Sequence, residues 1–301
     1  MRETILHISA AFMLLVCGAC GSDEPKENPG NEKPVATAGY VDVEILEYAP
    51  APGQFINEMP EFIAGMNASA MLERANRSIS NGELVSLGAW GGSIVYKLGK
   101  SIANKDGGDF RIVGNSYYSY TVDGVQCGSS EPGIVYVMKD SNGNGRPDDG
   151  WYELQGSHSD MAKTASVAYS ERQLTDDTFD LYVSGPGSES QHWTSDPEYH
   201  PHSYMPLWLT QAELRFDGRM LPANGQKLDN GQYTQECYTG YADSQPNNSS
   251  ASELDISAAR GLNGEPVELD RIDFIKVQTG VLQFNGHLGE CSTEVGRIQV
   301  L

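Results

Sequence analysis

"GIVYVMKDSNGNGRPDDGWYELQG", residues 133 to 156, places two short apolar segments on either side of a polar loop. The flanks GIVYVM and WYELQG have the composition of strands, because β-branched and aromatic residues are common in them. The loop between them is rich in Asp, Asn, Gly and Pro, which favour tight turns. This stretch predicts two strands joined by a long polar loop, as expected of an all-β protein.

The same strand pattern recurs along the chain. In VDVEIL, the side chains of Val41, Val43 and Ile45 share one face, opposite two acidic residues, as in a half-buried strand. Similar segments are GSIVYKL, DFRIVG, FDLYVSG, AELRFDG, DFIKVQTG and RIQVL. Many short strands with long loops predict a β-sandwich of jelly-roll type, formed as a single domain by residues 40–301.

One short peripheral helix is predicted directly after Asn67, a residue type that suits a helix N-cap. Apolar residues then recur at helical spacing: Ala68, Met71, Leu72, Ala75 and Ile79. We expect this helix to lie against one edge or end of the sandwich.

The N-terminus has the features of a bacterial lipoprotein signal. Arg2 precedes an apolar run over residues 5–16 that is too short to span a bilayer, so residues 1–19 are predicted to be a signal peptide. Cys20 follows two small residues and resembles the lipidated cysteine of a lipobox. Residues 20–39 are polar, acidic and Pro-rich, which predicts a flexible tether. A plain secretory signal is the alternative, because Cys17 occupies the usual Leu position.

Composition limits the classes of partner. The chain of 301 residues has a formal net charge of -21, which disfavours nucleic acid and anionic membrane as direct partners. Contact with a membrane is therefore expected only through the lipid anchor. Cys127, Cys237 and Cys291 remain after the signal region, and an odd number cannot all pair within one chain. Cys237 and Cys291 are able to pair in an oxidising compartment, but spacing does not fix the connectivity.

The polar loop has the donor spacing of a calcium site. A calcium loop takes oxygens from positions 1, 3, 5, 7 and 9, with a glycine at position 6, here Gly145. Position 12 is Trp151 instead of a carboxylate, and Asp149 and Glu153 are the nearby substitutes. The predicted structural Ca²⁺ ligands are Asp140, Asn142, Asn144, the carbonyl of Arg146, Asp148 and Asp149. A polar hairpin loop that binds no metal is the alternative.

A second candidate site is SQHWTSDPEYHPHSYMPLW, residues 190 to 208. Aromatic side chains on a loop stiffened by prolines provide contact area at low entropic cost, which suits sugars, planar rings or corrinoids. The predicted ligand-binding residues are His192, Trp193, Tyr199, His202, Tyr204 and Trp208. A minor core under the sandwich is the alternative, and His200 with His202 makes a weaker case for a metal pair.

A third polar group comes from GYADSQPNNSSASELDIS and GHLGECSTEVG. Asp243 and Asp255 are candidates for a second cation or a ligand hydroxyl, although such acids, including Glu290 and Glu294, more often solvate loops. No GxSxG, HExxH, P-loop or dinucleotide-binding glycine pattern is present, so no enzyme activity is predicted. Glycoside hydrolysis is the runner-up from another class.

Several phrases together are similar to a family of Bacteroidetes cell-surface lipoproteins, also labelled PKD-associated cell-surface proteins. They are VEILEYAPAPGQFINEMPEF, LVSLGAWGGSIVY, SSEPGIVYVMKDSNGNGRPDDGWYEL, YMPLWL, GYAD, DFIKVQTGV and LGECSTEVG. The resemblance runs from about Val41 to the C-terminus. Members often occur near TonB-dependent transporters, including those for vitamin B12. The acidic residues behind Cys20 also resemble the surface-export signal of Bacteroidetes lipoproteins.

The resemblance implies a lipid-anchored protein of the outer membrane, exposed at the cell surface. Its expected role is to bind an extracellular nutrient and to assist a TonB-dependent transporter. Cobalamin is the leading ligand by this association, and a glycan is the alternative. No ligand-contact residue is carried over from the family.

Overall fold

The structure is a computed structural model that describes residues 36–186, 190–261 and 263–301, all within one compact unit. The predicted signal peptide, most of the tether, and Cys20 lie outside the described residues. No described helix is long and apolar enough to cross a bilayer. The protein is mostly β, as the sequence predicts.

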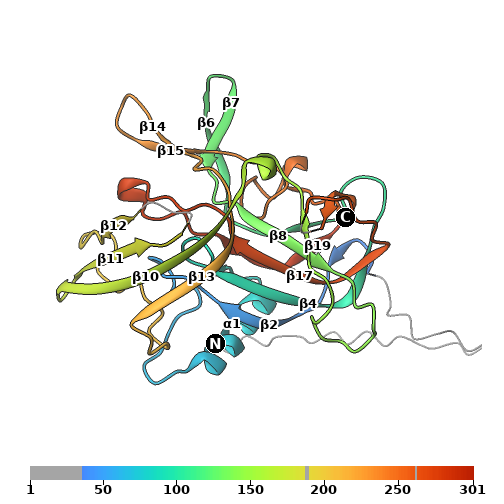
Figure 1. Cartoon of the computed structure of the whole chain (residues 1–301), viewed down its shortest axis with the longest axis horizontal. Helices are drawn as coiled ribbons and strands as arrows, with labels where there is room; N and C mark the ends of the chain where they lie inside the picture. Colours follow the sequence, from blue (N-terminus) through green and yellow to red (C-terminus); the bar gives the residue numbers. More distant parts are fainter. Residues whose placement is uncertain (1–35, 187–189, 262) are drawn as a thin grey trace, which may run out of the picture. The chain divides into compact units, whose positions relative to one another are not determined.

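The largest sheet among the described residues is antiparallel and has six strands in the order β16-β9-β8-β17-β4-β2. Figure 1 labels four of them, β8, β17, β4 and β2. Strands β8 and β17 pair over six residues and are buried along most of their length. The strands are Val43–Ala49 (β2), Ser93–Ala103 (β4), Gly133–Met138 (β8), Tyr152–Leu154 (β9), Ala259–Arg260 (β16) and Arg271–Thr279 (β17). The two flanks of the polar loop therefore become the neighbouring strands β8 and β9.

The residues that the structure describes also form two sheets of four strands and two smaller sheets. The sheet β12-β11-β10-β13 contains Gln191–Thr194, Thr178–Ser184, Lys163–Thr175 and Glu213–Met220. The sheet β14-β15-β7-β6 contains Gly225–Lys227, Tyr233–Glu236, Val125–Ser129 and Tyr117–Val122, and its two hairpins project together in Figure 1. The order β1-β19-β5 joins Gly39–Tyr40, Ile298–Val300 and Phe110–Ile112, and β18 (Glu294–Val295) pairs with β3 (Val85–Ser86).

The jelly-roll sandwich predicted from the sequence is wrong. The four sheets of three or more strands are arranged as in a four-bladed β-propeller, and not as two large sheets packed face to face. The physical reason is strand pairing: β6 with β7, β10 with β11 and β14 with β15 pair as sequence neighbours, which builds small separate sheets. Strand patterns report burial of one face, but they carry no information about which strands share a sheet.

The helix predicted after Asn67 is confirmed as α1, Ala68–Asn81. The Asn67 side chain accepts a hydrogen bond from the Ala70 N–H at 3.0 Å, and Gly82 ends the helix in the left-handed conformation. Asn76 on this helix bonds to both backbone groups of Ile45 in β2, at 2.7 and 3.0 Å. The helix therefore lies against an edge strand of the largest sheet.

Within the described part of the chain, four short 3-10 helices lie in the connections. They are η1 (Ser159–Met161), η2 (Ser250–Ser252), η3 (Ile256–Ala258) and η4 (Gly286–Leu288). Helices η1 and η4 each border a pocket, so these connections shape the candidate sites.

Candidate metal and ligand sites

Loop 140–149 brings the predicted calcium ligands together through its own hydrogen bonds. The Asp140 carboxylate accepts the N–H groups of Asn144 and Gly145 at 3.1 and 2.9 Å, which curls the loop around this side chain. The side-chain amides of Asn142 and Asn144 both donate to Asp148 at 2.9 to 3.2 Å. Gly143 and Gly145 have positive φ angles of 71° and 70°, which permit this tight path. Oxygen-bearing side chains at the first, third, fifth and ninth positions therefore converge.

The twelfth position of the loop is not completed by a carboxylate. Glu153, a predicted substitute, forms an ion pair with Arg219 at 3.1 Å on another strand and lines a cavity. Asp149 remains in the loop, where its side chain accepts the Ser141 N–H at 3.0 Å. Hydrogen bonds from Asn144 and Asn142 lower the pKa of the Asp148 carboxyl. That carboxylate is therefore ionised, as a calcium ligand must be.

The predicted aromatic stretch is divided between the core and the surface. Trp193 and Tyr204 are 3% and 2% exposed and belong to one hydrophobic cluster. Trp208, at 7% exposed, packs in a different cluster with Met71 of α1 and Ile56. These three side chains are buried in hydrophobic clusters, as expected if the stretch contributes to a core and not to a binding surface.

The other three residues of that prediction are exposed. The His192 Nε2 lies 3.0 Å from an Asp180 carboxylate oxygen, and its ring stacks on Tyr182. Tyr199 is 64% exposed, and the His202 Nε2 lies 3.9 Å from a carboxylate oxygen of Glu58. The structure does not gather all six predicted residues on one surface.

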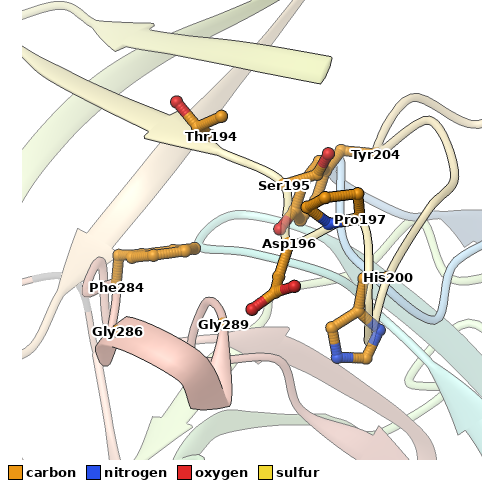
Figure 2. Close-up of a pocket in the computed structure, with 9 residues that line it drawn as sticks. All are labelled: Thr194, Ser195, Asp196, Pro197, His200, Tyr204, Phe284, Gly286 and Gly289. Carbon is orange, nitrogen blue, oxygen red and sulfur yellow. The ribbon is translucent and has the colours of Figure 1, made fainter. Parts of the chain in front are cut away.

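Part of the same stretch nevertheless lines a pocket of about 410 Å³ (Figure 2). Figure 2 shows the Asp196 side chain pointing toward the segment that carries Gly286 and Gly289. Burial lowers the pKa of His200, with opposing effects from nearby acids, so the ring is neutral near pH 7. The lining residues are Thr194, Ser195, Asp196, Pro197, His200, Tyr204, Phe284, Gly286 and Gly289.

A buried acidic cluster is formed by Glu131, Asp243 and Glu294. Their carboxylate oxygens lie within 4.8 Å of one another, a spacing able to hold a metal ion. Asp243 is 4% exposed and accepts the N–H groups of Asn115, Ser116 and Glu294 at 2.9 to 3.1 Å. These bonds position the Asp243 carboxylate against the start of β18.

The other two carboxylates are held by the Ser292 segment. Glu131 accepts the Ser292 N–H, and Glu294 accepts the Ser292 hydroxyl, both at 2.9 Å. Asp243 adopts a left-handed backbone with φ of 50°, which is uncommon for a residue with a side chain. A Cβ at Gly114 would lie only 2.4 Å from an Asp243 carboxylate oxygen, so glycine is required there.

Burial, followed by repulsion among the acids, sets the protonation of this cluster. It raises the pKa of Asp243 to about 8 and that of Glu294 to about 7, and it raises the pKa of Glu131 well above its ordinary range. A cation between them would offset the same repulsion. Asp243 and Glu294 are almost fully buried. Neither carboxyl is therefore open to a substrate as a general acid or base.

The sequence alone did not predict most of this cluster. Asp243 was a candidate for a second cation, and it does belong to the cluster. Glu290 and Glu294 were expected only to solvate loops, but they are 1% and 2% exposed. Glu131 was not singled out at all. Asp255 does not join Asp243, because its side chain caps η3 by accepting the Ser257 N–H at 2.7 Å. The only available signal was that these acids fall within short phrases rich in Gly and Ser.

The three cysteines of the described residues are free thiols, so the pairing of Cys237 with Cys291 is not formed. Burial raises the pKa of the Cys237 thiol to about 12. A thiol with so high a pKa is a poor nucleophile and metal ligand at neutral pH.

The fold and sites thus define an all-β protein with one buried acidic cluster able to hold a metal ion. Comparison with protein-family models gives no match, and comparison with curated proteins gives none either.

Proposed function

We propose that this protein captures a small extracellular nutrient and assists a TonB-dependent transporter of the outer membrane. The observation that carries the proposal is the pocket of about 410 Å³ beside the predicted aromatic stretch. Its volume falls within the range of about 300 to 1,000 Å³ that is usual for small-molecule sites. The rings of His200, Tyr204 and Phe284 give it apolar walls, and Asp196 supplies a hydrogen-bond acceptor.

Cobalamin is the leading ligand by family resemblance, and a glycan is the alternative. A corrinoid is larger than this pocket, so only one edge or side group would enter it. A single sugar unit would fit as a whole. The neutral His200 ring suits either ligand, since it has one nitrogen that donates and one that accepts a hydrogen bond.

Calorimetry with cyanocobalamin and with a panel of glycans tests this proposal. His200→Ala should weaken binding of the true ligand by about tenfold or more, because the ring forms part of the wall. Asp229→Ala, in an exposed turn, is the matched control and should bind like the wild type. If neither ligand class gives heat of binding, nutrient capture in this pocket is wrong.

We further infer that loop 140–149 binds a structural calcium ion. Support comes from the convergence of Asp140, Asn142, Asn144 and Asp148 at the spacing of a calcium loop. The carbonyl of Arg146 and the carboxylate of Asp149 are the remaining proposed donors. Elemental analysis of protein purified in calcium should find the ion in the wild type and a lower content in Asp140→Ala.

We also propose that Cys20 is lipidated and that the domain faces the medium. The support is the signal-like N-terminus followed by an acidic tether. Cys20→Ala should release a soluble protein from the membrane fraction. Protease added to whole cells should digest the wild-type domain; digestion only after lysis would contradict surface exposure.

A further inference from the structure

A second cavity, of about 590 Å³, lies between the six-stranded sheet and the sheet that contains β10 and β13. Strands β8, β9 and β16 form one wall through Tyr136, Glu153 and Arg260. Strands β10 and β13 form the other wall through Thr164 and Arg219. The cavity shares no lining residue with the pocket of Figure 2.

One side of the cavity is a fixed polar pair. The Arg219 Nε lies 3.1 Å from a Glu153 carboxylate oxygen, and its Nη2 donates to the carbonyl of Ser159 at 2.6 Å. The Nε and the carboxylate are close enough for an ion pair, but the Nε does not form a hydrogen bond. The guanidinium is therefore held in place by η1 as much as by Glu153. The pair gives the cavity both donors and acceptors in set positions.

Two aromatic residues lie beside this pair. Tyr136 is directly opposite Glu153 across strands β8 and β9 and lines the cavity. Trp151, just before β9, is half-buried, whereas Trp90, Trp193 and Trp208 are at most 7% exposed. Trp151 is thus the one tryptophan of the four whose ring is available to a ligand.

The charges that line the cavity cancel. Glu153 and Asp160 are opposed by Arg219 and Arg260, in a chain whose net charge is -21. The Nη1 of Arg260 donates to the backbone carbonyls of Ser257 and Ala259, and the side chain has no carboxylate partner among the described residues. An anionic ligand would meet the repulsion of the whole chain, and a cationic ligand would meet two guanidinium groups.

We propose that this cavity binds a neutral sugar, with one face of the ring against Trp151 and its hydroxyls bonded to the Glu153 and Arg219 pair. Sugar hydroxyls both donate and accept, which matches a wall of carboxylate, guanidinium, amide and hydroxyl groups. The C–H face of a pyranose is apolar and gains from burial against an aromatic ring. This sugar site is separate from the nutrient pocket proposed above.

Binding to an array of neutral and acidic oligosaccharides, followed by calorimetry with the strongest neutral binder, tests the class of ligand. Neutral glycans should bind. Their affinity should change little between about 50 mM and about 500 mM NaCl, because a neutral sugar forms no ion pair with the protein that salt could screen. Binding of acidic glycans alone, or of no glycan, would overturn the proposal.

Variants then locate the site. Trp151→Ala should lower the affinity for the sugar by about tenfold or more. Gln155→Ala should lower it by several fold, and this substitution carries little risk to folding because Gln155 is exposed. Tyr117→Ala, at an exposed aromatic of β6, should leave affinity unchanged. If His200→Ala abolishes sugar binding while Trp151→Ala and Gln155→Ala do not, the sugar occupies the other pocket and this inference fails.

Discussion

Replacing Glu294 by Gln should make the stability of this protein less sensitive to pH. Glu294 is 2% exposed, and burial raises the pKa of its carboxyl from 4.5 to about 7. The folded chain therefore retains a proton that the unfolded chain releases near its ordinary pKa. The stabilisation from this group is complete below the unfolded pKa and is lost as the pH rises through about 7.

The magnitude follows from that difference in pKa. At about 1.4 kcal/mol per pH unit, the rise from 4.5 to about 7 corresponds to roughly 3 kcal/mol of unfolding free energy. Gln keeps an oxygen that accepts the Ser292 hydroxyl, so the hydrogen bond at 2.9 Å is preserved. It also removes one charge beside Asp243 and Glu131, which lowers repulsion within the cluster.

Urea unfolding in EDTA at about pH 5 and about pH 8 measures this effect. Gln does not titrate, so the wild type should lose roughly 2.5 kcal/mol more than Glu294→Gln between the two conditions. The remainder of the effect is already lost at about pH 5, which lies above the unfolded pKa. Glu83→Gln, at an exposed position, should behave like the wild type. An equal loss in wild type and Glu294→Gln would refute the reasoning.

Three further predictions concern other parts of the structure. Asn76→Ala should lower the unfolding free energy by about 2 kcal/mol, since it removes two bonds to Ile45; a loss near zero in urea titrations would contradict the contact between helix and edge strand. Gly114→Ala should cost about 1 to 3 kcal/mol, because the new Cβ meets an Asp243 oxygen at 2.4 Å, and an unchanged melting temperature would count against this packing. Calcium should reduce acrylamide quenching of Trp151, two residues after the loop, whereas identical quenching in EDTA would show that the loop and the cavity are not coupled.

The positions of individual strands and of the helix could be predicted from the pattern of apolar and polar residues within each segment. Alternation in segments such as VDVEIL and DFIKVQTG identified strands, and Asn67 with its apolar repeat identified α1, because these signals depend on neighbouring residues. The arrangement of sheets did not follow, since β17 pairs with both β8 and β4 across more than 130 residues of chain. Such pairing depends on long-range packing that no local pattern encodes.

The candidate sites also differ in how far the sequence predicted them. Loop 140–149 is contiguous, so the spacing of Asp140, Asn142 and Asn144 was visible in the sequence. The acidic cluster is assembled from Glu131, Asp243 and Glu294, which are far apart in the chain, and of these the sequence suggested only Asp243 as a cation ligand. In the aromatic stretch, composition alone did not separate side chains of the core from those of a pocket wall.

The melting temperature in calcium and in EDTA tests most directly whether loop 140–149 holds a structural ion. Calcium at a hundredfold excess over Kd should add about 2.7 kcal/mol to the stability. In a domain of this size that corresponds to a rise of roughly 5 to 10 °C.

Asp140→Ala should abolish the rise, because its carboxylate organises the loop through the N–H groups of Asn144 and Gly145. Asp229→Ala, which removes an equal charge from an exposed turn, should keep it. Calcium should therefore raise the melting temperature of Asp229→Ala and of the wild type but not that of Asp140→Ala. The same wild-type melting temperature in calcium and in EDTA would show that the loop holds no structural ion.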